Sequence, residues 1–138
     1  MPSPGKKRNT GCPVAFALDT FGDRWTLVII RDIMMRGKTT YGEFLESDEN
    51  IATNVLADRL KHLEAEGIIG KARDPENRRR IIYNVTDKGW ELAPMILDMI
   101  VWSAKYDPDS KVRQPMLDKI STDRDGLIAE IRHRSTDD

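Results

Sequence analysis

The succession of segments between residues 40 and 85 constrains the fold more than any other feature of the sequence. Thr40 and Glu43 have the spacing of a capping box, in which a threonine caps a helix and a glutamate three residues later reaches back to the cap. A short helix is expected from this box, followed by a polar turn at residues 47–50. The three side chains expected to turn inward from the short helix are Tyr41, Phe44 and Leu45.

A longer helix is predicted over residues 52–66. Leu56, Leu60 and Leu63 recur at intervals of four and three, which places them on one apolar stripe. Gly67 is expected to end the helix. With the leucines inward, the opposite face carries Asn54, Asp58, Lys61 and Ala65, with Ala57 and His62 on its flanks.

Two strand-like runs follow at residues 68–73 and 80–85. The residues between them are rich in turn formers, so the pair is predicted to be a β-hairpin. A short capped helix, a turn and a longer helix make a helix-turn-helix, and a hairpin directly after it makes a winged helix. The predicted fold is therefore mainly α with a small β-hairpin, an architecture that places its second helix in the major groove of DNA.

The hairpin concentrates positive charge in a chain whose net charge is only −1. Between residues 71 and 80 the basic side chains are Lys71, Arg73, Arg78, Arg79 and Arg80, and the acidic ones are Asp74 and Glu76. At the tip and second edge of a wing, the three consecutive arginines would meet phosphates or reach into a minor groove. The alternative is a solvated charged turn.

The longer helix supplies candidate base contacts. Asn54 can pair with an adenine edge and Thr53 can contact a thymine methyl group, while Lys61 suits a phosphate. Asp58 could accept a hydrogen bond from cytosine, or orient Lys61 or His62, whereas ordinary helix surface is the alternative for each of these residues. The residues predicted to contact DNA are Thr40, Tyr41, Thr53, Asn54, Ala57, Asp58, Lys61, Arg78, Arg79 and Arg80.

The rest of the chain divides into a flexible N-terminal arm at residues 1–11, a domain over residues 12–106 and a C-terminal helical extension at residues 107–138. Within the domain, helices are expected from Pro13 to about Gly22, over residues 25–35 and from a cap at Thr86 to about residue 106, with Pro94 bending the last or shifting its start. Almost every position of residues 92–102 is apolar, more than one domain face can bury. This helix is therefore expected to pack against a partner.

The chain resembles the HxlR-type winged-helix transcriptional regulators over roughly residues 12–105. The segments that carry the resemblance are Cys12-Pro13, Leu18, Gly22-Asp23-Arg24-Trp25-Thr26, Ile30-Arg31-Asp32, Tyr41-Gly42-Glu43-Phe44, Ile51, Leu56, Leu60, Leu63-Glu64, Gly67-Ile68-Ile69, Arg80, Tyr83 and Thr86-Asp87-Lys88-Gly89. Residues 107–138 lie outside it.

The resemblance implies a homodimer that binds an inverted-repeat operator, with helices near both ends of the domain forming the interface. The residues predicted to lie in this interface are Phe16, Met95, Met99 and Trp102. Many relatives carry serine, a natural helix cap, at the position of Ala52. Asn50 or Thr53 would have to cap the helix in this chain.

Cys12 is the single cysteine and matches the N-terminal cysteine of the family, which in several relatives senses oxidants, quinones or other electrophiles. Its place at a helix start favours the thiolate. A lone cysteine can form an intersubunit disulfide, form a mixed disulfide with a small thiol, or be alkylated. The alternative is a small buried hydrophobe.

Other functional classes find less support. There is no run of 18 apolar residues and no apolar segment after the basic N-terminus, so a cytoplasmic protein is expected. One cysteine and two histidines do not make a zinc site, and no metal or cofactor is expected. Gly37-Lys38-Thr39 lacks the earlier glycine of a phosphate-binding loop, because Asp32 stands there, and we expect no enzyme. A winged helix used only for protein–protein contact is the remaining alternative, and its binding would not weaken steeply with salt as DNA binding does.

Overall fold

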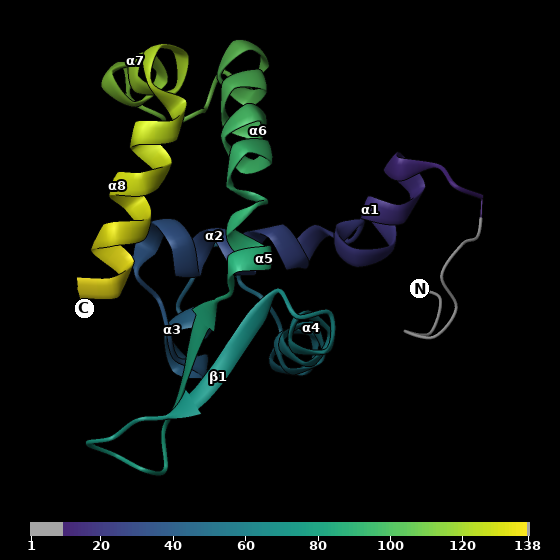
Figure 1. The fold of residues 1–138 in the computed structure, drawn as a ribbon, viewed down its shortest axis with the longest axis vertical. Helices are drawn as coiled ribbons and strands as arrows, with labels where there is room; N and C mark the ends of the chain where they lie inside the picture. Colours follow the sequence, from purple (N-terminus) through teal and green to yellow (C-terminus); the bar gives the residue numbers. More distant parts are fainter. Residues whose placement is uncertain (1–9, 138) are drawn as a thin grey trace. The chain divides into compact units, whose positions relative to one another are not determined.

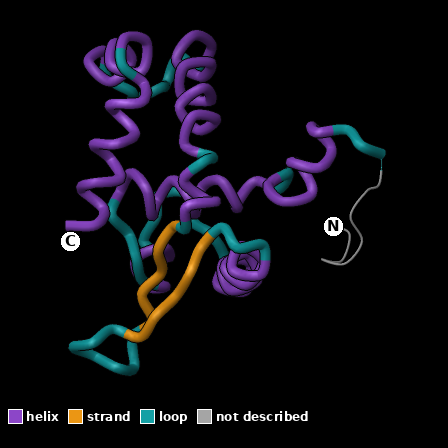
Figure 2. The backbone as a smooth tube through the Cα atoms, in the orientation of Figure 1, coloured by secondary structure: helices purple, strands orange, loops and turns teal. Residues whose placement is uncertain are grey.

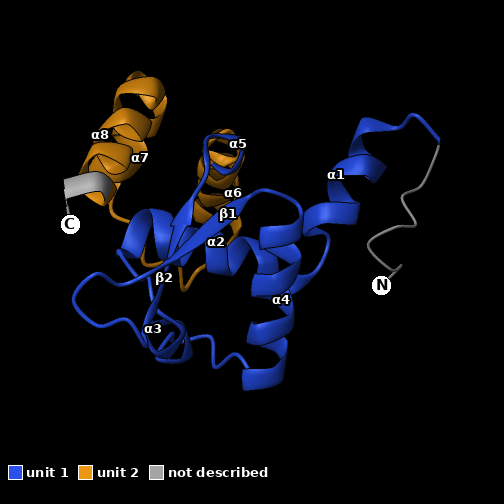
Figure 3. Ribbon diagram, turned by 60° about the horizontal axis from the view of Figure 1, so that its bottom comes forward, with its two compact units in different colours: residues 1–89 blue, residues 90–138 orange. Residues whose placement is uncertain are grey.

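The computed structural model describes residues 10–137. The chain forms two compact units, residues 1–89 and residues 90–138 (Figure 3). Residues 1–9, most of the predicted arm, lie outside the described residues. Within the described residues, no helix is both long and apolar enough to cross a membrane.

The first unit begins with two consecutive helices. Helix α1 (Pro13–Phe21) has Cys12 at its N-cap, where the Sγ atom accepts a hydrogen bond from the backbone N–H of Ala15 at 3.5 Å. Helix α2 (Arg24–Arg36) ends at Gly37, whose φ of 66° is in the left-handed region that glycine adopts without strain. Both helices follow the prediction, and α2 carries much of the core through Ile29, Ile30, Ile33 and Met34.

Helix α3 (Tyr41–Leu45) starts with the predicted capping box between Thr40 and Glu43. Phe44 is 1% exposed and anchors the helix in the core. The inward orientation expected for Tyr41 is wrong, because this side chain is 36% exposed. Its hydroxyl donates to the backbone carbonyl of Thr53 at 2.9 Å, an acceptor at the surface where α4 begins.

Helix α4 (Thr53–Ala65) buries the predicted leucine stripe almost completely. The expected side-chain cap from Asn50 or Thr53 is wrong. Ala52 is the N-cap residue and makes no side-chain hydrogen bond, since Thr53 already belongs to the helix and Asn50 has a positive φ of 57°. Gly67, with a φ of 74°, follows the helix end as predicted.

Strands β1 (Ile69–Arg73) and β2 (Ile81–Val85) pair antiparallel, each one residue shorter than predicted. The pairing runs from Ile69 opposite Val85 to Arg73 opposite Ile81, and the connecting loop forms the free end of the hairpin (Figure 2). Helix α4 lies beside β1, so the hairpin stands next to the second helix of the helix-turn-helix (Figure 1). We call this hairpin the wing.

The continuous helix predicted from residue 86 to residue 106 is wrong. A short helix α5 (Asp87–Trp90), capped by the Thr86 hydroxyl, is separated from α6 (Ala93–Tyr106) by a turn at residues 91–92. Pro94 lies in the first turn of α6, where its missing N–H costs no helical hydrogen bond. Proline therefore shifts the start of the helix, one of the two effects expected of it.

The second unit contains α6, α7 (Gln114–Thr122) and α8 (Arg124–Asp137). Of these, α7 and α8 lie within residues 107–138, where helices were expected. Ile120, Leu127 and Ile131 are buried. Helix α8 packs against α6, and Arg124 forms an ion pair with Asp98 at 2.5 Å. Residues 90–106, which the sequence analysis assigned to the same domain as the wing, thus belong to the compact unit that holds the extension.

Candidate nucleic-acid interface

The outward face of α4 is polar and accessible. Asn54, Ala57, Asp58 and Lys61 are all exposed, because the leucine stripe turns the opposite side of the helix into the core. This is the face that the sequence analysis selected for base contacts. Contact of these four residues with DNA stays a prediction.

The inner side of α4 is attached to the segment between α1 and α2. Arg59, whose side chain is 13% exposed, forms an ion pair with Asp23 at 3.4 Å. The His62 ring nitrogen Nε2 lies 2.7 Å from the carbonyl oxygen of Thr20, at the end of α1. These two contacts fix α4 relative to the α1–α2 corner in addition to its apolar packing, and sequence reasoning found neither of them.

Asp23 is itself held in place. Burial alone would raise the pKa of its carboxyl group, but hydrogen bonds from Thr26 and Trp25 and the charge of Arg59 lower the pKa overall. Its Oδ2 atom accepts from the backbone N–H groups of Trp25 at 3.0 Å and Thr26 at 3.1 Å, which caps α2. The carboxylate therefore offers Arg59 a fixed negative partner.

Asp58 is paired with its neighbour in the sequence. Arg59 Nε donates to Asp58 Oδ2 at 3.1 Å, and Nη2 donates to the same oxygen atom. The partner of Asp58 is thus Arg59, and not Lys61 or His62, the two partners expected from the sequence. The Asp58 side chain is nevertheless 64% exposed.

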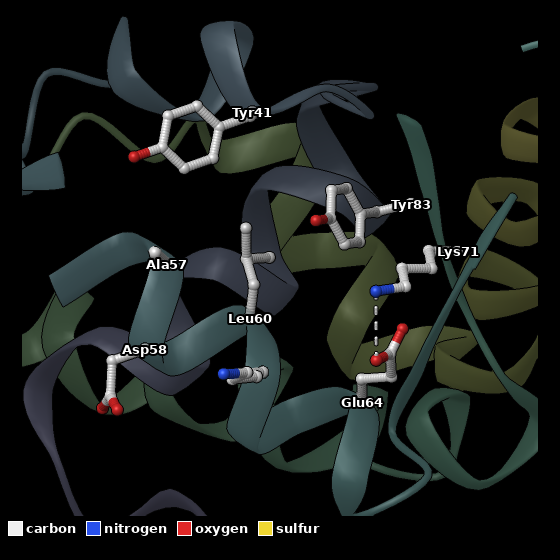
Figure 4. A pocket seen from close by; sticks show the side chains of 8 residues that line it. Tyr41, Ala57, Asp58, Leu60, Glu64, Lys71 and Tyr83 are labelled. Atoms are coloured by element: carbon white, nitrogen blue, oxygen red, sulfur yellow. Dashed lines mark ion pairs between the residues drawn. The ribbon is translucent and has the colours of Figure 1, made fainter. Parts of the chain in front are cut away.

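A groove of about 330 Å³ lies between α3, α4 and the wing (Figure 4). Tyr41 comes from α3, Leu60 from the stripe of α4 and Tyr83 from β2. Lys71 of β1 and Glu64 of α4 point toward one another and form an ion pair at 3.4 Å. The helix-turn-helix and the wing therefore present one continuous surface.

The three wing arginines are not equivalent. Arg80 forms an ion pair at 2.5 Å with Asp74, whose side chain is only 7% exposed. Arg78 and Arg79 lie exposed in the turn, and no carboxylate among the described residues pairs with their side chains. Their charges are available to an external anion, while that of Arg80 is engaged.

Asp74 organises the wing loop, a role that the sequence analysis did not assign. Its Oδ1 atom accepts from the backbone N–H of Glu76 at 2.9 Å, and this bond, with the hydrogen bond from Arg80, lowers the pKa of the Asp74 carboxyl group. Arg73 reaches across the loop and donates to the carbonyl of Arg78 at 2.8 Å. The signal in the sequence was the aspartate before Pro75, a common opening of a turn.

A second groove, of about 480 Å³, separates the start of α3 from the wing. Thr40 and Tyr41 line one side of it, and Arg79 and Arg80 line the other. Residues from three of the predicted contact segments, α3, α4 and the wing, thus line two grooves that share Tyr41 and Tyr83.

The residues predicted to sense oxidants or to form a dimer are mostly accessible. Cys12 is exposed on the single chain and is not part of its core. Phe16 on α1 is 57% exposed. On α6, Met99 is 49% and Trp102 is 65% exposed, whereas Met95 is half-buried.

Comparison with known proteins gives consistent matches. A family model described as HxlR-like helix-turn-helix matches residues 20–111. The HTH-type transcriptional regulator YvaP of Bacillus subtilis (strain 168) is 34% identical over 90 residues, which are 65% of this chain and 82% of YvaP. YodB, an HTH-type transcriptional regulator of the same strain, is 33% identical over 99 residues, which are 71% of this chain and 88% of YodB.

Two solved structures extend these matches. The redox regulator HypR in its oxidised form has a TM-score of 0.62 and 29% identity, covering 73% of this chain and 100% of HypR. The reduced form of YodB has a TM-score of 0.57 and 29% identity, covering 72% of this chain and 98% of that one. The fold, the family model and the curated relatives agree, and this chain belongs to the HxlR-like helix-turn-helix family of transcriptional regulators.

Proposed function

We propose that this regulator binds an inverted-repeat operator as a homodimer, with α4 in the major groove and the wing along the flanking backbone. The observation that carries the proposal is the exposed polar face of α4 beside a wing that presents Arg78 and Arg79 without acidic partners among the described residues. Asn54 and Thr53 are the candidate base contacts at the start of α4, and Lys61 is a candidate phosphate contact.

Tyr41 and Thr40 are proposed to contact the DNA backbone from the start of α3. The Tyr41 hydroxyl is tied to the first residue of α4, and both side chains line the groove that Arg79 borders. A phosphate that enters between α3 and the wing would meet hydroxyl groups on one side and the guanidinium group of Arg79 on the other. Ala57 would contact an apolar base edge, such as the methyl group of thymine.

The exposed apolar side chains support a dimer. Phe16 and Trp102 are more than half exposed and Met99 about half, and Trp102 packs on Tyr106 with ring centroids 5.2 Å apart. Large aromatic and methionine side chains are enriched at the centres of protein interfaces. A twofold dimer that buries these side chains, and Met95 on the same helix as Met99 and Trp102, would place two copies of α4 on two half-sites of an operator.

Cys12 is proposed as the site that switches the regulator. It is exposed, it caps α1, and α1 leads to the corner that holds α4. HypR, described as a redox regulator, has structures of its oxidised and reduced forms, and YodB has structures of its reduced form and of the diamide-treated protein. Oxidation to a disulfide, or alkylation by an electrophile, would change the cap and with it the position of α1.

A mobility-shift experiment with the regulator's own upstream DNA tests the proposal. The parent, Cys12→Ser and Lys61→Ala are compared with Lys111→Ala, which removes a positive charge outside the proposed interface. A specific shift should appear with the parent, weaken steeply with salt, and disappear after treatment with diamide or a quinone only when Cys12 is present.

The outcomes separate the parts of the proposal. A specific shift that ignores oxidants in the parent would remove the switch and leave the DNA contacts. The absence of any shift, with specific or unrelated DNA, would favour a protein-interaction module instead. A protein that sediments as a monomer at the concentrations that shift DNA would remove the dimer.

A further inference from the structure

We propose that Asp58 is the residue of α4 that selects cytosine, its Oδ1 atom accepting a hydrogen bond from the N4 amino group of one cytosine in each operator half-site. The inference rests on the proposed function, because it requires α4 to lie in the major groove of operator DNA. It adds a base identity, which neither the fold nor the relatives supply.

The position of Asp58 places it among the candidate base contacts. Asn54 precedes it by four residues and Lys61 follows it by three, so all three lie on the same exposed face of the helix. The side chain is 64% exposed and belongs to the lining of the groove between α4 and the wing. In Figure 4 its carboxylate extends away from the two tyrosine rings on the far side of that groove.

The chemistry of the carboxylate restricts what it can meet. An ionised carboxylate has only acceptors, so phosphate oxygens and the acceptor edges of guanine and thymine repel it. In the major groove the donors are the amino groups of cytosine and adenine. Adenine presents its N7 acceptor beside its amino group, which leaves cytosine as the base that an aspartate suits best.

The Asp58 side chain is already oriented in the protein without DNA. Two nitrogens of Arg59 donate to Oδ2, which leaves Oδ1 to accept from another donor. Arg59 is in turn paired with Asp23, the N-cap residue of α2. Because these contacts already restrict the Asp58 side chain, it loses less conformational entropy when it binds DNA. Arg59 is therefore a positioning residue for the contact between Asp58 and cytosine.

The pairing also reduces the repulsion that Asp58 would exert on the DNA backbone. The guanidinium group lies within hydrogen-bond distance of the carboxylate and spreads positive charge beside it. An unpaired aspartate on this face would weaken binding to every sequence. A paired one weakens binding mainly where no amino group meets its remaining oxygen atom.

Selection of bound sequences from a randomised double-stranded DNA library tests the inference. The parent, Asp58→Ala, Asp58→Asn and the control Lys61→Ala are compared after thermal unfolding has verified that each variant folds. The parent should prefer cytosine at one position of each half-site by roughly tenfold, within the range of a specific base contact. Asp58→Ala should lose the preference at that position alone, and Asp58→Asn should shift it toward adenine.

Two further variants sharpen the result. Lys61→Ala should weaken binding to all sequences without changing any base preference, as loss of a phosphate contact does. Arg59→Lys keeps the charge near Asp23 but loses the forked donor, and should reduce the cytosine preference without abolishing selection at other positions. A purely structural role of Arg59 would not change one base position in isolation.

The inference fails if Asp58→Ala selects the same sequences with the same preferences as the parent. It fails also if the affected position prefers a base other than cytosine. These outcomes leave the proposed function intact, because the parent still selects a sequence. A parent protein that selects no sequence at all would overturn both proposals.

Discussion

Replacement of the wing arginines one at a time should distinguish the charges that meet DNA from the charge that holds the wing together. Arg78 and Arg79 are exposed in the turn, whereas Arg80 is paired at 2.5 Å with Asp74. We therefore expect Arg78→Ala and Arg79→Ala each to remove one phosphate contact. Arg80→Ala should instead loosen the loop that Asp74 organises.

The expected size of the effect follows from counterion release. Each phosphate contact contributes about 0.9 to the slope of log affinity against log salt. Over a fourfold rise in salt, the parent should therefore lose roughly 3.5 times more affinity than a variant that lacks one contact. The double variant Arg78→Ala/Arg79→Ala should differ from the parent by about 12-fold over the same range, if the two contacts are independent.

Fluorescence anisotropy with a labelled operator, measured between about 50 and 200 mM salt, gives these slopes directly. Lys111→Ala serves as the control, since it removes the same charge from an exposed position outside the proposed interface. Its slope should equal that of the parent. Arg80→Ala should lower affinity at every salt concentration with a smaller change of slope than either turn variant.

The reasoning would be refuted by the reverse pattern. If Arg78→Ala and Arg79→Ala kept the parent slope while Arg80→Ala lost a full contact, the ion pair with Asp74 would have to open when DNA binds. The structure without DNA would then rank the three arginines wrongly by their contribution to phosphate binding.

Further results are expected for four variants. In thermal unfolding, Gly89→Ala should destabilise the protein by about 1–3 kcal/mol or more, because the added methyl group would lie 2.3 Å from a backbone carbonyl oxygen. The methyl group added by Gly42→Ala would enter open space, so this variant should be neutral or stabilising by about 0.5–1 kcal/mol. The backbone hydrogen bond from Thr39 and the neighbouring hydroxyl and backbone bonds lower the pKa of Glu43, despite its partial burial. The stability that Glu43 contributes is therefore complete above the ordinary pKa of a glutamate, and it is lost as the pH falls through the lower pKa of the folded protein. Glu43→Gln should accordingly reduce the fall of the urea unfolding midpoint at acid pH. Trp102→Ala should weaken dimerisation at least tenfold in sedimentation equilibrium, because burial of a large side chain stabilises by about 1.5–3 kcal/mol; an unchanged dimer would place the interface elsewhere.

Much of the fold could be predicted from the sequence because its strongest signals are local. The capping box of Thr40 and Glu43 and the spacing of Leu56, Leu60 and Leu63 depend on residues three or four apart, and both are confirmed. Side-chain partners that are distant in the sequence were not predictable in this way. The hydrogen bond between His62 and Thr20 exists only because α4 packs against the α1–α2 corner.

The wrong predictions have separate physical causes. Tyr41 carries an apolar ring and a hydroxyl, and its surface position was decided by an acceptor on α4 that periodicity does not reveal. The break between α5 and α6 followed from Pro94, whose two effects, a bend or a later start, the sequence could not separate. In the candidate site, the outward face of α4 was predictable, but the unequal state of the three wing arginines depended on the burial of Asp74.

The attachment of α4 to the α1–α2 corner has a thermodynamic consequence. Cys12 lies at one end of α1, and Thr20, which contacts His62, lies near the other. If oxidation of Cys12 weakens operator binding through this path, the coupling free energy is shared by both events and acts with equal size in either direction. Bound operator DNA would then disfavour oxidation of the Cys12 thiol by the same factor by which oxidation weakens operator binding. A regulator bound to its operator would therefore be oxidised at a more oxidising solution potential than the free regulator.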